Sequence, residues 1–125
     1  MKDLTDLQLD VMRAVWSVGP ASVAEIHEEL SKTRELAPTT VATLLRRLCK
    51  DQLLSASQNG RQLIYAAKAS ESDVRRNTVR RLRDRLFGGD AVAVVQHLLT
   101  SGSIRAGDVR RIQSLIAEAR EGRNK

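Results

Sequence analysis

Apolar residues recur at helical spacing near the start of the chain. They occupy positions 4, 7, 11, 12, 15 and 16, which follows the 3.6-residue period of an amphipathic helix. Thr5 or Asp6 is expected to cap this helix, and the VGP sequence at 18–20 is expected to end it. A second apolar stripe, at positions 23, 26, 27 and 30, follows Ser22, and Glu25 stands three residues after that serine. This spacing is typical of a capping box and predicts a second helix.

The next segment, APTTVATLLRRLCK at 37–50, predicts a helix with two chemically different faces. Pro38 suits the first turn, where a missing amide hydrogen does little harm. The expected buried stripe is Val41, Leu44, Leu45 and Leu48. The opposite face and its flanks carry small polar and basic residues, namely Thr39, Thr40, Ala42, Thr43, Arg46, Arg47 and Lys50.

After this helix the pattern changes from helical to extended. The segments 53–57 and 62–66 look like short strands, and Asn59-Gly60 lies between them. An Asn-Gly pair between two such runs is a strong signal for a β-hairpin. Three helices followed by a hairpin are the winged-helix variant of the helix-turn-helix. We therefore predict a mainly α fold with a winged-helix domain at residues 1–68.

The polar face of the third helix has the residue types that read a DNA groove. Threonine offers a hydroxyl and a methyl to base edges, and arginine binds guanine or phosphate. Arg61, at the tip of the predicted hairpin, would reach a neighbouring phosphate or the minor groove. An arginine-bearing wet face is also ordinary for a surface helix, and threonines near a helix start are often caps. The order of the elements and the hairpin favour the DNA-binding interpretation.

Residues 69–125 are predicted to form a helical dimerisation domain. An arginine-rich helix at 70–87 carries only a thin apolar line, the FGGD sequence at 87–90 breaks it, and two amphipathic helices follow. Three helices with few tertiary partners of their own need another surface to cover them, and helix-turn-helix proteins commonly bind paired half-sites as dimers. The expected homodimer residues are Leu82, Leu86, Val95, Leu98, Leu99, Val109, Ile112, Leu115 and Ile116.

The charge is distributed unevenly along the chain. The net charge of +6 divides into −3 for residues 1–36, +3 for 37–66 and +6 for 67–125. A basic surplus attracts polyanions such as nucleic acid, although a merely solvated surface would also account for it. The arginines of the 70–87 helix could contact flanking phosphates or lie in solvent, and solvation is the favoured interpretation.

Composition narrows the class of protein further. Hydrophobic residues make up 42% of the chain, but only Trp16, Tyr65 and Phe87 are aromatic, so the core is expected to be aliphatic. No apolar run approaches the roughly 18 residues of a membrane span, and the acidic start does not resemble a signal peptide. The single cysteine, Cys49, cannot form an internal disulfide, which favours the reducing cytoplasm.

No catalytic or metal-binding constellation is apparent. His27 and His97 are far apart in the sequence and lack the spacing of a zinc site. His27 is expected to be a packed histidine, and Cys49 is expected to act as a small buried hydrophobe. We therefore predict a protein that is not an enzyme and that needs no cofactor or metal.

Several stretches together resemble the penicillinase repressor family of the BlaI and MecI type. They are LTDLQLDVMRAVW, SVAEIHEEL, TTVATLLRRLCKDQLL, LIYAA and LFGGD, and the match runs from about residue 4 to residue 119. The resemblance implies a winged-helix domain joined to a helical dimerisation domain, acting as a homodimeric repressor on a dyad operator. It also implies that Thr40, Thr43 and Arg47 contact the groove and its phosphates.

The same resemblance implies relief of repression by proteolysis. In the family, a membrane sensor metalloprotease triggered by an antibiotic leads to cleavage between Asn and Phe, just after the Gly-Gly-Asp joint. The corresponding pair here is His97-Leu98, which keeps the polar and large apolar character but not the residues. Copper-responsive relatives carry a C-terminal cysteine cluster, and this chain ends EAREGRNK, which disfavours copper sensing.

Two other classes of function compete with this interpretation. One is a ligand-sensing winged-helix regulator with a small-molecule pocket between the two regions, although the shortage of aromatic residues disfavours such a pocket. The other is an adaptor that uses the winged helix to bind protein.

Overall fold

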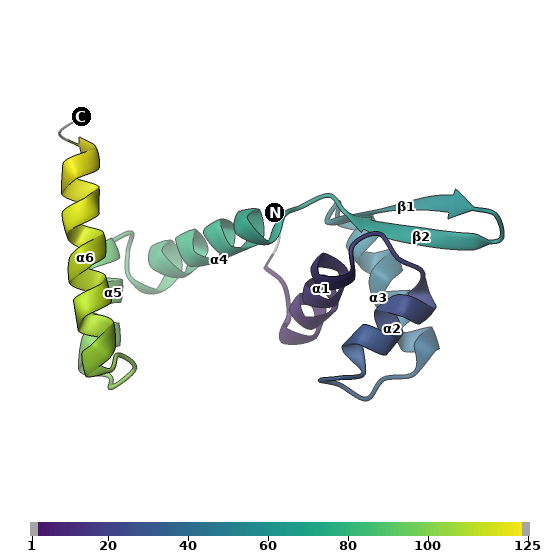
Figure 1. Cartoon of the computed structure of the whole chain (residues 1–125), viewed down its shortest axis with the longest axis horizontal. Coiled ribbons are helices and arrows are strands. Elements are labelled where there is room, and N and C mark those ends of the chain that lie inside the picture. Colours follow the sequence, from purple (N-terminus) through teal and green to yellow (C-terminus); the bar gives the residue numbers. More distant parts are fainter. Residues whose placement is uncertain (1–2, 124–125) are drawn as a thin grey trace. The chain divides into compact units, whose positions relative to one another are not determined.

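The computed structural model describes residues 3–123, which form two compact units divided between Val79 and Arg80 (Figure 1). The first unit contains three helices, a hairpin and the start of a fourth helix. The elements are α1 (Asp6–Val18), α2 (Val23–Leu30), α3 (Pro38–Lys50), β1 (Leu54–Asn59), β2 (Gln62–Ala67), α4 (Glu71–Leu86), α5 (Ala91–Thr100) and α6 (Ala106–Arg123). The predicted helices and the mainly α winged-helix fold are confirmed.

The first two helices each begin with a capping box, which the sequence predicted for α2, whereas for α1 it predicted only a cap at Thr5 or Asp6. Thr5 Oγ1 accepts a hydrogen bond from the Gln8 amide at 3.1 Å, and the Gln8 side chain accepts one from the Thr5 amide at 3.0 Å. Ser22 and Glu25 exchange the same two bonds at 3.3 and 3.1 Å. Each box satisfies amide groups that have no partner within the helix, so α1 and α2 have well-defined starts.

The apolar stripes of these helices meet in one aliphatic core. Val41, Leu45 and Leu48 of α3 are fully buried, whereas Leu44 is half-buried at the edge of the same stripe. Trp16 packs against the core, and its indole Nε1 donates to the Ala69 carbonyl at 2.9 Å, which ties α1 to the segment before α4. The remaining core residues include Val11, Met12, Val15, Ile26, Leu30, Leu53, Leu54, Tyr65 and Val74.

The hairpin pairs β1 with β2 from Leu54↔Ala67 to Asn59↔Gln62. Its two-residue loop is therefore Gly60-Arg61, which contains Arg61 as predicted, and Asn59 belongs to the strand. Gly60 takes the left-handed φ of +64° that a glycine-first hairpin loop requires. Asn-Gly and Gly-Arg are both acceptable turn pairs, and cross-strand pairing selects the second.

A third segment adds to this small sheet. Ala21 forms an isolated antiparallel bridge with Tyr65, with backbone bonds of 3.0 and 2.8 Å in the two directions. The bridge fixes the base of the hairpin to the turn between α1 and α2. Tyr65 is buried in the core at this point, so the wing is anchored by its side chain and by its backbone.

The second unit has a different character. Asp90 caps α5 by accepting hydrogen bonds from the amides of Val92 and Ala93 at 3.0 and 3.2 Å. Among the described residues, none beyond Val74 is fully buried. Over residues 3–123, no helix combines the length and the apolar composition needed to cross a membrane.

Candidate nucleic-acid interface

The polar face of α3 is exposed to solvent along the whole helix. Because Val41, Leu45 and Leu48 are anchored in the core, the opposite side of the helix must face outward. Ala42 is half-buried and lies at the edge of this face. The exposed members of the face are Thr39, Thr40, Thr43, Arg46, Arg47 and Lys50.

Side chains on this face are linked by hydrogen bonds along the helix. Thr43 Oγ1 donates to the Thr39 carbonyl at 3.0 Å, and Arg46 Nη2 donates to the same hydroxyl oxygen at 3.2 Å. The hydroxyl hydrogen of Thr43 thus points back into the helix, while its oxygen holds the guanidinium of Arg46. This arrangement limits the directions in which Arg46 extends.

Arg47 has an acidic neighbour in Asp51, the residue that follows the last residue of α3. Its Nε lies 3.5 Å from a carboxylate oxygen of Asp51, and the Arg47 side chain is 57% exposed. An ion pair this exposed contributes at most about 1 kcal/mol. Arg47 could therefore leave the Asp51 carboxylate and bind a DNA phosphate at little energetic cost.

The wing places Arg61 in an exposed loop. The amide of the Gln58 side chain donates to the Gly60 carbonyl at 3.0 Å, which braces this loop. Leu63, in β2, is 45% exposed and lies on the same face of the strand as Tyr65. Sequence reasoning did not single out Gln58 or Leu63, although the two-residue period of a strand puts Leu63 on that face.

Cys49 lies on the inner flank of α3 and is half-buried. Burial raises the pKa of its thiol, so the neutral, weakly nucleophilic form predominates at neutral pH. The side chain also packs against the core. These properties are those of the small hydrophobe that the sequence predicted.

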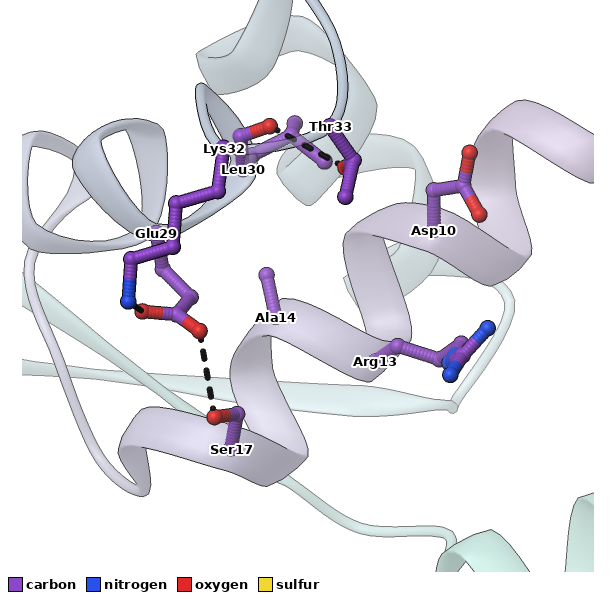
Figure 2. Close-up of a pocket in the computed structure, with 8 residues that line it drawn as sticks. All are labelled: Asp10, Arg13, Ala14, Ser17, Glu29, Leu30, Lys32 and Thr33. Atoms are coloured by element: carbon purple, nitrogen blue, oxygen red, sulfur yellow. Dashed lines mark hydrogen bonds and ion pairs between the residues drawn. The ribbon is translucent and has the colours of Figure 1, made fainter.

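A cleft of about 270 Å³ lies between α1 and α2 (Figure 2). Glu29 accepts from Lys32 Nζ at 2.8 Å and from the Ser17 hydroxyl at 3.2 Å. The hydrogen bond from Lys32 lowers the pKa of Glu29, and the same bond raises the pKa of Lys32. Glu29 and Lys32 therefore already bind each other. Among the described charged residues of this cleft, Arg13 is the main group left to bind a ligand.

Helices α1–α3 with a hairpin wing, and a threonine- and arginine-rich helix face turned to solvent, define a winged-helix DNA-binding protein. The chain belongs to the penicillinase repressor family, whose model matches residues 4–118. The resemblance seen in the sequence motifs is thereby confirmed. The family consists of DNA-binding transcriptional repressors and not of enzymes.

Individual relatives align over most of the chain. It is 34% identical to the transcriptional regulator BlaI of Mycobacterium tuberculosis over 92% of this chain and 75% of that one. It is 26% identical to the penicillinase repressor of Bacillus licheniformis, over 92% and 90% of the two chains. The solution structure of the B. licheniformis BlaI monomeric form in complex with the blaP half-operator matches with 35% identity and a TM-score of 0.50, covering 58% of this chain and 88% of that one.

Replacement of Arg47 by alanine should weaken DNA binding about equally for all sequences. If Arg47 contacts one phosphate, the slope of log K against log salt concentration should fall by about 1. Fluorescence anisotropy titrations at several salt concentrations would measure this slope. Arg120→Ala, which removes one exposed charge from α6, is the matched control and should leave the slope unchanged. An unaltered slope in Arg47→Ala would remove this residue from the interface.

Proposed function

We propose that this repressor binds a dyad operator as a homodimer, with α3 and the wing of each copy on one half-site. The observation that carries the proposal is the exposed Thr39–Lys50 face, held rigidly by the fully buried stripe on the other side of the same helix. The B. licheniformis relative was solved as a monomer on a half-operator, which supports one half-site for each copy.

Within this face, the residues divide into two roles. Thr39, Thr40, Ala42 and Thr43 are short enough to approach base edges closely, and their methyl and hydroxyl groups suit thymine methyls and polar edges. The longer basic side chains, together with the wing, bind phosphates or guanine and set the register on the duplex. The long basic residues are Arg46, Arg47, Lys50 and Arg61.

Dimerisation through the second half of the chain is supported by its uncovered apolar surface. We propose that the dimer forms through residues 69–125, the segment that follows the wing, although the start of α4 in this segment packs through Val74 in the core of the first unit. Exposed apolar surface of this extent is unusual for a monomer and is typical of an interface. Ile112 is half-buried, and the other predicted dimer residues are 38–73% exposed, namely Leu82, Leu86, Val95, Leu98, Leu99, Val109, Leu115 and Ile116.

The direct test is selection of duplexes from a random-sequence DNA pool by the purified full-length protein. The proposal predicts recovery of a palindromic site with half-site centres about one or two helical turns apart. The selected duplex should bind at least about a hundredfold more tightly than a scrambled one at physiological salt, within the range of specific binders. Recovery of no common sequence would contradict operator recognition, and the adaptor interpretation would then take its place. A non-palindromic site would contradict the dyad.

Replacement of Leu115 by aspartate should separate the dimer. Leu115 is 62% exposed on α6, and an unpaired carboxylate buried in an interface is strongly unfavourable. The dimer dissociation constant, measured by analytical ultracentrifugation, should rise at least about a hundredfold, equivalent to about 2.8 kcal/mol. Gln113→Asp places the same charge on an exposed polar position of α6 and should leave the dimer intact. If the Leu115→Asp protein were still dimeric, this face of α6 would be excluded as the dimer interface.

We further propose that repression is relieved by cleavage between His97 and Leu98, triggered by a membrane sensor metalloprotease of the antibiotic-response type. The bond lies in the last turns of α5, and Leu98 is 42% exposed. The His97 ring packs edge-on against Phe87 with centroids 5.8 Å apart, so this turn must open before a protease can bind it.

Cleavage can be tested by mass spectrometry of the repressor from cells that carry the sensor protease, with and without a β-lactam. Fragments 1–97 and 98–125 should accumulate after the antibiotic is added, and Leu98→Asp should block their formation. Relief of repression with an intact chain would contradict proteolysis and would favour a ligand-sensing regulator.

A further inference from the structure

The loop between α2 and α3 decides where the first turn of α3 lies. Unlike α1 and α2, α3 has an alanine, Ala37, at its N-cap position, which provides no side-chain cap, and no acidic residue stands in its first turn. Thr39 and Thr40 follow directly. The position of these two threonines therefore depends on what holds the loop and not on a local capping motif.

Backbone hydrogen bonds hold only the first half of this loop. The amides of Thr33 and Arg34 donate to the Leu30 carbonyl at 3.0 and 2.9 Å and continue the last turn of α2. Across the described part of the chain, no backbone bond is formed by the amides of Glu35 and Leu36. The second half of the loop, adjacent to α3, needs other contacts.

Side chains of the two neighbouring helices supply those contacts. From α2, His27 Nε2 lies 2.7 Å from the Leu36 carbonyl oxygen, one residue before the α3 cap. Because a carbonyl oxygen only accepts, Nε2 carries the hydrogen and donates it. From α1, the Asp10 carboxylate forms an ion pair and hydrogen bond with Arg34 Nε, although the two residues are 24 positions apart.

Both contacts are partly shielded from water. His27 is half-buried, and the side chains of Arg34 and Asp10 are 39% and 31% exposed. Leu36 packs against the core beside them. A nearby ion pair provides a contrast, because Lys32 binds only Glu29, three residues before it at the end of α2, and it is Glu29 that reaches α1 through the Ser17 hydroxyl.

We propose that His27, Asp10 and Arg34 are positioning residues for operator binding, which set the orientation of the first turn of α3 without touching DNA themselves. This inference rests on the proposed function, since it takes α3 as the DNA-reading helix. It assigns to α1 and α2 a role in specificity, because a shift of the first turn would misplace Thr39 and Thr40 relative to base edges.

Asp10→Asn is the most informative variant, because the proposal and simple electrostatics predict opposite signs. Removal of a negative charge from a DNA-binding unit should by itself leave affinity unchanged or raise it. Weakening of the Arg34 contact, from an ion pair to at most a neutral hydrogen bond with the asparagine amide oxygen, should instead lower affinity for the selected operator up to about tenfold, with affinity for a scrambled duplex unchanged. Both affinities would be measured by fluorescence anisotropy with the full-length protein.

Matched variants separate positioning from other effects. Arg34→Gln and Lys32→Gln each remove one positive charge from the same loop, and only Arg34→Gln should reduce the preference for operator over scrambled DNA. His27→Gln keeps an amide N–H that can donate to Leu36 and should retain most of the preference, whereas His27→Leu should lose it. The Asp10→Asn/Arg34→Gln double variant should show the same preference for operator over scrambled DNA as either single variant, because the two substitutions affect the same contact.

Amide hydrogen exchange distinguishes a local shift from loss of the fold. In Asp10→Asn and His27→Leu, the Thr40 and Val41 amides at the start of α3 should exchange faster, while the Leu45 and Leu48 amides keep their protection. Equal operator preference in Asp10→Asn, His27→Leu and the parent would overturn the proposal, as would loss of protection throughout α3. A parent protein without any operator preference would instead overturn the proposed function itself.

Discussion

Burial of the apolar stripe of α3 is the constraint on which the rest of the structure depends. Val41, Leu45 and Leu48 are fully buried against the α1 and α2 residues of the same core. Full burial of each such side chain contributes about 1.5–3 kcal/mol, so rotation of α3 about its axis would lose much of the stability of the unit. The same packing therefore fixes the direction of the threonine and arginine face, and the interface inherits its rigidity from the core.

The two units differ in whether their apolar side chains are buried or exposed. The first buries its aliphatic residues within one chain and ties the wing to the core through Tyr65 and its bridge to Ala21. The second leaves its valines and leucines exposed over α5 and α6. Apolar surface left in water is unfavourable, and an exposed patch of such residues is typical of an interaction surface. One chain thus combines a unit that buries its own aliphatic core with a unit whose exposed apolar residues form the surface that we propose for the dimer.

The charge pattern reinforces the arrangement set by packing. Acidic residues are concentrated in α1, α2 and the loop that follows, whereas α3 and the wing carry four basic side chains and only Asp51 as an acid. A basic segment attracts a polyanion and an acidic one repels it, so this distribution favours the approach of DNA to α3 and the wing. Asp10 belongs to the acidic residues of α1, and its ion pair with Arg34 also links α1 to the loop before α3.

The sequence by itself determined the elements and the composition of the interface. Helical periods, the capping residues Thr5, Ser22 and Asp90, and the face from Thr39 to Lys50 follow from interactions between residues three or four apart, which a sequence displays directly. Only the tertiary structure decided the hairpin register at Gly60-Arg61, the Trp16–Ala69 bond and the tethers of His27 and Asp10 on the loop before α3. The physical reason is that these contacts join groups distant in the chain, or choose between locally equivalent turns, and their energies depend on how whole elements pack.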